Sequence, residues 1–219
     1  MKLPDKTRLA LTAAAIALQI VVALSLLFYT TRVRSHALKT GSVISLACRA
    51  YDPFSPFKGR YVRLTFEQSE VQGEVLDDES REYLVKLSKG KKVYCRMQEG
   101  EDGIWTVTGI RQNRPQGNAG SGQDSVYIEA ELRWYDYDYS EGEKAVQSVR
   151  LDYSFDEYYM QENYARLVDR IQWSDFNALE PVLSLYVGED GRCVQKSLTV
   201  LDAGERIAIE EYCRRRLDE

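Results

Sequence analysis

The feature that most constrains this 219-residue chain is an uncharged apolar run near its N-terminus. Leu9 to Tyr29 reads LALTAAAIALQIVVALSLLFY, and Gln19 is its only strongly polar residue. At about 1.5 Å per residue, a helix of this length spans a hydrocarbon core of roughly 30 Å. Such a helix also satisfies its own backbone polar groups in lipid. The run therefore predicts a transmembrane anchor within residues 1–31, with the lipid bilayer as its first expected partner.

Two alternatives to a retained anchor remain. A buried core helix would normally contain charges over so long a stretch. A cleaved signal peptide is the stronger rival, because Ser35-His36-Ala37 has the small–x–small form of a cleavage site. However, Arg32 and Arg34 lie between the run and that site, and the run is longer than a typical signal-peptide core. We therefore expect a retained single-pass anchor in the cell membrane.

The flanking charges do not fix the orientation of this anchor. Three basic residues lie on each side of the run: Lys2, Lys6 and Arg8 before it, and Arg32, Arg34 and Lys39 after it. The positive-inside rule returns a near tie for this distribution. The chain has a net charge of −5, and Asp5 is the only acid among the first 31 residues. Since an acidic domain repels phosphate backbones, we expect no nucleic-acid partner.

The chain after the anchor alternates apolar and polar residues with period two, which predicts strands. In Ser42 to Ala50 the apolar positions are Ile44, Leu46, Cys48 and Ala50. Further strands are expected at Tyr61 to Phe66, Arg81 to Leu87, Lys92 to Met97, Ile104 to Ile110, Ser125 to Tyr137, Val146 to Phe155, Val182 to Val187 and Cys193 to Leu201. The pattern predicts a mainly β (α+β) fold: an antiparallel β-rich domain with one short helix.

Three segments interrupt this alternation. Glu162 to Trp173 has apolar residues at helical spacing and predicts the short helix. Arg111 to Asp124 is polar and rich in Gly, Asn and Gln, so we expect a mobile loop and a candidate internal boundary at 111–124. The expected organisation is an anchor at 1–31, a juxtamembrane linker at 32–41, one β-rich domain at 42–209 and a charged tail at 210–219.

Composition restricts the chemistry open to this domain. The single histidine, His36, lies beside the anchor, so this chain alone cannot build a Ser-His-Asp or Cys-His arrangement or a histidine zinc site in the domain. The four cysteines, Cys48, Cys95, Cys193 and Cys213, have no CxxC spacing. They are either disulfide-bonded in an exported domain or small buried thiols. We assign no catalytic residue and no cofactor, and we expect a protein that is not an enzyme.

The most unusual run is Trp134-Tyr135-Asp136-Tyr137-Asp138-Tyr139. On one strand face, Asp136 and Asp138 are weak candidates to hold a divalent cation such as calcium. On the other face, Tyr135, Tyr137 and Tyr139 are placed to stack on a sugar or a peptide. Two carboxylates are too few to fix a metal, so we favour a solvated edge strand and no metal. A carboxylate-based or metal-dependent hydrolase, or a ligand-binding domain, is the alternative function.

The segment from Asp52 to Phe66, DPFSPFKGRYVRLTF, resembles the signature of the GDYXXLXY family of membrane-anchored bacterial proteins of uncharacterised function. The glycine, tyrosine and leucine of the motif fall on Gly59, Tyr61 and Leu64. Its aspartate is Arg60 here, and its last tyrosine is Phe66. The change to Arg60 reverses a charge, so no role that depends on that carboxylate carries over. The resemblance implies a periplasmic domain that works beside a polytopic membrane protein or an envelope component.

The same residues have a physical interpretation of their own. Pro53, Pro56 and Gly59 fix an irregular turn before a strand. Tyr61 and Arg63 would then face outward, or across to a partner, while the alternate residues enter the core. The candidate contacts for a partner or ligand are Asp52, Gly59, Arg60, Tyr61 and Arg63. The alternative is a purely structural turn and strand in which Tyr61 packs on its neighbour.

Overall fold

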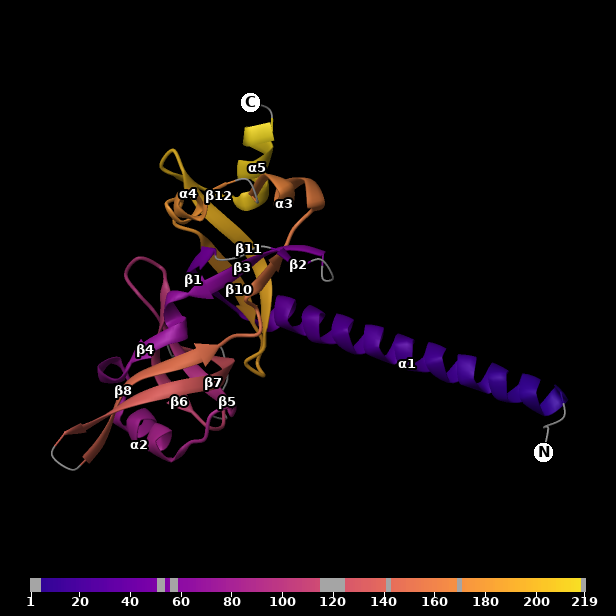
Figure 1. Cartoon of the computed structure of the whole chain (residues 1–219), viewed down its shortest axis with the longest axis horizontal. Helices are drawn as coiled ribbons and strands as arrows, with labels where there is room; N and C mark the ends of the chain where they lie inside the picture. Colours follow the sequence, from indigo (N-terminus) through magenta and orange to yellow (C-terminus); the bar gives the residue numbers. More distant parts are fainter. Residues whose placement is uncertain are drawn as a thin grey trace.

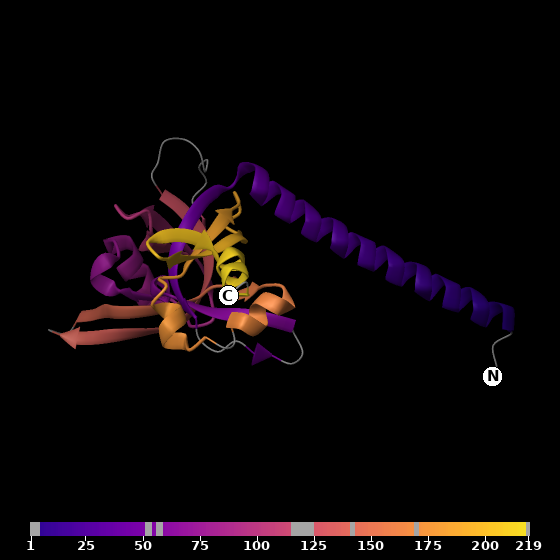
Figure 2. The same ribbon diagram turned by 90° about the horizontal axis from the view of Figure 1, so that it is seen from above.

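The computed structural model describes residues 5–50, 54–55, 59–114, 125–140, 143–168 and 171–217. A long helix, α1 (Asp5–Thr40), extends away from a β-rich body in both views (Figures 1 and 2). Within α1, Leu11–Arg32 is long and apolar enough to cross a membrane, and none of this stretch is buried in the protein. A core helix would bury its apolar side chains, so the alternative of a buried core helix is wrong. The predicted linker continues the same helix as far as Thr40.

The body contains two antiparallel sheets, which confirms the mainly β prediction. The first sheet has seven strands in the order β12-β11-β10-β1-β3-β2, with β9 also paired to β3. Its strands are β1 (Ser42–Ala50), β2 (Phe54–Ser55), β3 (Gly59–Phe66), β9 (Glu157–Tyr159), β10 (Val182–Val187), β11 (Cys193–Asp202) and β12 (Glu205–Ala208). β1 has its predicted bounds, and its four predicted core residues are buried.

The seven-stranded sheet curls so that β11 lies close to β9. No strand pairing joins these two strands in the described part of the chain. Instead, Gln195 Nε2 on β11 donates to the carbonyl oxygens of Phe155 and Glu157 at 2.9 and 3.0 Å. Side-chain contacts such as this one therefore bridge the seam between β9 and β11, where a strand ladder would make several backbone hydrogen bonds.

The second sheet has five strands in the order β4-β8-β7-β5-β6. They are β4 (Glu70–Gln72), β5 (Lys92–Glu99), β6 (Trp105–Arg111), β7 (Ser125–Ser140) and β8 (Glu143–Asp152). A bulge makes Arg133 an extra residue of β7, between the pairs Leu132↔Leu151 and Trp134↔Arg150. The extra residue reverses the alternation. Tyr135 and Tyr137 therefore follow Leu132 on the inner face and pack against the core.

One predicted strand is a helix. Arg81 to Leu87 falls almost entirely within α2 (Asp78–Lys86), which packs against the five-stranded sheet (Figure 1). The Asp77 side chain accepts a hydrogen bond from the Ser80 N–H at 2.9 Å, which caps the first turn. Leu84, a residue of α2, is fully buried. The cap and this buried residue favour a helix over the strand that the local alternation predicted.

Two tyrosines of β7 hold the other end of α2. The Tyr135 hydroxyl donates to the Leu87 carbonyl at 2.9 Å, and the Tyr137 hydroxyl donates to the Leu84 carbonyl at 3.2 Å. The last carbonyls of a helix lack the usual partner within the helix, and the hydroxyls supply donors there. The Leu84 carbonyl also accepts from the Leu87 N–H at 3.2 Å. The hypothesis that Tyr135 and Tyr137 form an outward stacking surface is therefore wrong, because both attach α2 to the sheet.

Short helices cover the end of the curled sheet that lies near the C-terminus (Figure 1). The predicted helix from Glu162 to Trp173 is present as α3 (Glu162–Val168), and α4 (Trp173–Asn177) follows it. Most of the charged tail belongs to α5 (Ile209–Leu217), which has acids in its first turn and arginines in its last. This charge order complements the helix dipole.

The two sheets share one hydrophobic core. Short 3-10 turns at Glu67–Ser69 and Gly73–Val75 flank β4, which follows β3 directly in the chain. At the end of β3, the Phe66 ring lies 5.8 Å from the Tyr153 ring and 5.2 Å from the Phe155 ring, measured between centroids. Phe66 therefore joins the curled sheet to the segment that follows β8.

Candidate functional site

The strand that carries the family-like motif, β3, lies at the centre of the candidate site. Asp52 lies outside the described residues. The backbones of Gly59 and Arg60 pair with Ser55 and Phe54 of β2. The structure therefore places four of the five predicted contact residues on the paired strand β3 and leaves their function as a prediction.

Tyr61 is placed differently from its predicted outward position. It is 7% exposed, and its ring centroid lies 5.6 Å from that of Tyr159 on β9, which is 54% exposed. The register pairs the same two residues. Tyr61 thus packs on its neighbour, as the structural alternative expected, and Tyr159 is the aromatic side chain that solvent reaches at this point.

Arg63 lines a polar groove of 340 Å³ between the two sheets. Two more arginines line it, Arg133 from β7 and Arg150 from β8, together with the carboxylates of Asp152 and Asp156. The groove thus offers cations and anions side by side. Charges in this arrangement suit a polar or charged surface of a partner better than an apolar ligand.

The ion pairs in this groove are exposed and therefore weak. Arg63 Nε lies 3.5 Å from Asp156 Oδ2, and the two side chains are 39% and 40% exposed. Arg133 Nε lies 3.1 Å from Asp152 Oδ2, and these side chains are 63% and 46% exposed. Exposed pairs of this kind contribute about 0–1 kcal/mol, so a partner can exchange them at little cost.

Asp136 and Asp138 pair with Ser148 and Ala145 in the β7–β8 hairpin. This hairpin projects from the body (Figures 1 and 2). Asp136 is exposed, and its Oδ1 accepts from the Tyr137 N–H at 3.0 Å. Only the backbone of Asp138 is described. Within the described residues, no three side chains of the His, Cys, Asp or Glu type gather as a metal site would require. The carboxylate-based function therefore stays a prediction.

All four cysteines are free thiols in this structure. Burial raises the pKa of the Cys48 and Cys95 thiols to about 12 and that of Cys213 to about 11, and it also raises the pKa of Cys193. The thiolate is the nucleophilic form, so at neutral pH these groups stay protonated and unreactive. Of the two alternatives, disulfide bonds or small buried thiols, the structure shows the thiols.

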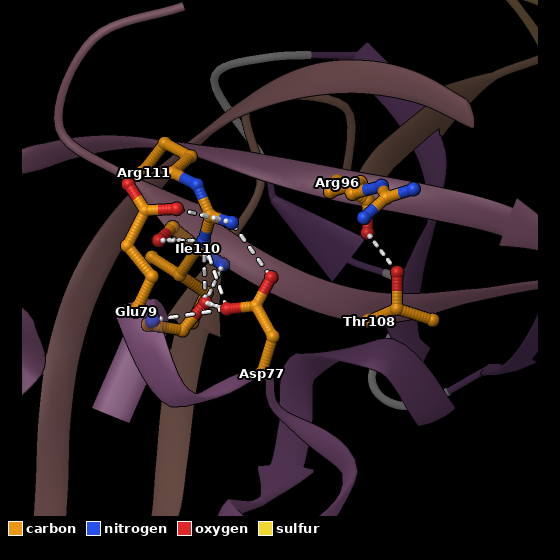
Figure 3. A network of polar contacts seen from close by, with 7 residues as sticks. Asp77, Glu79, Arg96, Thr108, Ile110 and Arg111 are labelled. Atoms are coloured by element: carbon orange, nitrogen blue, oxygen red, sulfur yellow. Dashed lines mark hydrogen bonds and ion pairs between the residues drawn. The ribbon is translucent and has the colours of Figure 1, made fainter. Parts of the chain in front are cut away.

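A second polar cluster, which sequence reasoning missed, joins α2 to β6 (Figure 3). Arg111 donates from Nη1 to Asp77 Oδ1 at 3.0 Å and from Nη2 to Asp77 Oδ2 at 2.6 Å, which makes a bidentate pair. Arg111 Nη2 also lies 2.9 Å from Glu79 Oε2. Arg111, the first residue of the predicted loop, ends β6 and is fixed by Asp77. Most of that loop, 115–124, lies outside the described residues, so the boundary at 111–124 stays a prediction.

Ser80 completes this cluster, and its side chain is fully buried. Its hydroxyl donates to Asp77 and accepts from the Ile110 N–H and from Arg111 Nη1, both at 2.7 Å. The hydrogen bonds from Arg111 hold the pKa of the Asp77 carboxyl well below its usual range. Every hydrogen-bonding site of the Ser80 hydroxyl is used. This arrangement locks α2 to the sheet and offers no bond to a ligand.

The fold and the groove together define a class: a β-rich domain on one long apolar helix, with a polar groove between two sheets. The chain belongs to the GDYXXLXY family, because the family model, described as GDYXXLXY protein, matches residues 23–198. The match covers the end of α1 and most of both sheets. No curated protein and no solved structure matches the chain in the other two comparisons.

Proposed function

We propose that this protein is a single-pass, membrane-anchored accessory protein whose β-rich domain binds a polytopic membrane protein or an envelope component. The observation that carries the proposal is that no residue of Leu11–Arg32 is buried, on a helix that leaves the body. So long an apolar surface is unfavourable in water but stable in a bilayer. The resemblance to the GDYXXLXY family supports the further proposal that the large domain lies outside the cytoplasm, in the periplasm of a cell with two membranes.

The polar groove and the exposed Tyr159 are the surfaces through which the domain would contact its partner. Arg63 and Tyr159 lie on the adjacent strands β3 and β9, and each side chain reaches solvent. Aromatic and arginine side chains dominate the energy of many protein interfaces. Tyr61 supports this surface from beneath, because its ring packs on Tyr159.

The anchoring itself is tested by extraction. The full-length protein should stay with membranes in alkaline carbonate and dissolve only in detergent, while a chain that lacks residues 1–31 should be released. Protease added to cells with a permeabilised outer envelope should degrade the domain. Release of the full-length protein by carbonate would contradict the anchor, and protection from protease would place the domain in the cytoplasm.

Partner binding is tested by co-purification of the full-length protein in a mild detergent. We expect a membrane protein in stoichiometric amount that is lost with Arg63→Glu or Tyr159→Ala. Both side chains are partly exposed, so these variants should melt close to the wild type. Lys89→Glu, at an exposed position beyond α2, is the matched control and should retain the partner. A partner that survives both groove-side variants would show that this surface is not the contact.

A further inference from the structure

A second cavity lies where α1 meets the curled sheet. It has a volume of 570 Å³ and is lined by Tyr29, Thr30, Tyr158, Tyr159, Cys193, Val194, Gln195 and Lys196. We call it the juxtamembrane pocket. Its floor is the seam between β9 and β11 that Gln195 bridges. Since α1 passes beside β10 and β11, the helix supplies one wall (Figure 1).

The position of α1 sets the depth of this pocket relative to the bilayer, an argument that rests on the proposed anchoring. Tyr29 and Thr30 lie in the last turn of the apolar stretch Leu11–Arg32. Residues at this end of a span lie at the level of the lipid headgroups, where tyrosine is favoured. Arg192 Nη1 donates to the Tyr29 hydroxyl at 2.8 Å, which holds the β10–β11 hairpin against the same turn.

The charge of the lining indicates the ligand. Lys196 is the only charged side chain among the described lining residues, although the protein as a whole is acidic. Lys196 is also the extra residue of a bulge, since β11 pairs Gln195 with Leu185 and Ser197 with Ser184 of β10. A bulge redirects a side chain away from the regular alternation of its strand. The Tyr158 hydroxyl donates to Glu210 and the Tyr159 hydroxyl donates to Glu157. The ammonium group of Lys196 lies 5.4 Å from the centroid of the Tyr186 ring.

We propose that the juxtamembrane pocket binds the headgroup of an anionic phospholipid, with Lys196 contacting the phosphate and Tyr29 flanking it. The pocket opens where lipid headgroups are present at high local concentration. Arg192 on the adjacent hairpin donates to the lining residue Tyr29 and also pairs with Asp190 at 3.6 Å. Arg32 ends the apolar stretch of α1. A bound headgroup would fix the domain against the membrane surface and orient the polar groove toward a neighbouring membrane protein.

The test is native mass spectrometry of the full-length protein in detergent, titrated with phosphatidylglycerol or with phosphatidylcholine of the same acyl chains. We expect about a fivefold preference for phosphatidylglycerol, as one basic residue near an anionic lipid surface provides. Lys196→Gln should remove most of this preference, and Lys89→Gln should leave it unchanged. Circular dichroism melts of both variants check that the fold is retained.

The outcomes separate this proposal from the accessory function. Equal binding of the two lipids, or a preference that survives in a folded Lys196→Gln protein, would overturn the lipid site while carbonate extraction and co-purification still test the anchor and the partner. Glycerol phosphate, the headgroup without its acyl chains, provides a further arm. If it competes at the concentration at which the lipid binds, the pocket recognises a soluble phosphate compound, and the lipid assignment is wrong.

Discussion

The two sheets of this domain differ in how fully the polar groups around them are hydrogen-bonded. In the five-stranded sheet, the first turn of α2 is bonded by Asp77, Ser80 and Arg111, and its last carbonyls accept from Tyr135 and Tyr137. In the curled seven-stranded sheet, side chains such as Gln195 bridge the seam between β9 and β11, and no strand ladder joins the two in the described part of the chain. The juxtamembrane pocket lies over that seam, and the groove opens between the sheets.

Because of this difference, we expect the region around α2 to be rigid and the region along β9 and β11 to bind ligands or partners. Polar groups that bond only one another specify a packing arrangement and have no capacity left for a ligand. Weakly paired charges such as Arg63 and Asp156, and exposed rings such as Tyr159, cost little to rearrange. We therefore expect substitutions around α2 to change stability and substitutions along β9 and β11 to change binding.

The largest effect should come from Arg111→Leu. Its guanidinium is 16% exposed and bonds Asp77, Ser80 and Glu79, so its removal leaves a serine hydroxyl and two carboxylates without their cation. We expect a loss of about 3 kcal/mol in the free energy of unfolding. Urea denaturation of the full-length protein in detergent measures this loss. Arg133→Leu, which removes an arginine that is 63% exposed from the same sheet, should cost under about 0.5 kcal/mol. Equal losses in the two variants would show that the cluster at α2 stabilises the protein no more than an exposed ion pair does.

A smaller effect, of about 1–2 kcal/mol at neutral pH, should follow Asp77→Asn. Asparagine still caps a helix, so the change removes mainly the charge that pairs with Arg111. Because the pKa of this carboxyl is lowered in the folded state, the ionised form stabilises the protein. That contribution is complete above the unfolded-state pKa, near ~4, and is lost as pH falls through the lower folded-state value.

Unfolding free energies of wild type and Asp77→Asn at a series of pH values check this prediction. The gap between the two proteins should stay constant from pH 7 to about pH 5 and should narrow below about pH 4. A gap that is independent of pH down to acid would show that Asp77 acts only as a helix cap.

The periodicity of apolar residues and the composition of short segments predicted much of this architecture, because both reflect the conformational preferences of neighbouring residues. The uncharged run from Leu9 to Tyr29 predicted α1, and the alternation of Ser42 to Ala50 predicted β1 to the residue. The helix at Arg81 to Leu87 was missed, although Asp77, Asp78 and Glu79 before it are the acids that favour a first turn. That signal was available in the sequence and was outweighed by the apparent alternation.

Other features lie beyond any local pattern. Arg111 bonds Asp77, which lies 34 residues earlier in the chain, and no local sequence spacing predicts that contact. The bulge at Arg133 reverses the faces of β7, which moved the tyrosines from the predicted surface onto α2. Among the candidate contacts, Arg63 reaches solvent whereas Tyr61 is covered, because β9 arrives from a distant part of the chain to pair with β3.

The smallest expected effect on the free energy of unfolding comes from removing one tyrosine hydroxyl from each sheet. Tyr137→Phe removes the donor to the Leu84 carbonyl at a partly buried site, and we expect a loss of about 1 kcal/mol. Tyr159→Phe removes a hydroxyl that donates to Glu157 Oε2 at an exposed site, and we expect a loss under about 0.3 kcal/mol. The ring is retained in both variants, so the difference isolates the hydrogen bond. Urea denaturation measures both losses under one condition. If Tyr159→Phe destabilises the protein as much as Tyr137→Phe, the seam beside the membrane is part of the rigid framework, and the separation between a locked sheet and an adaptable one fails.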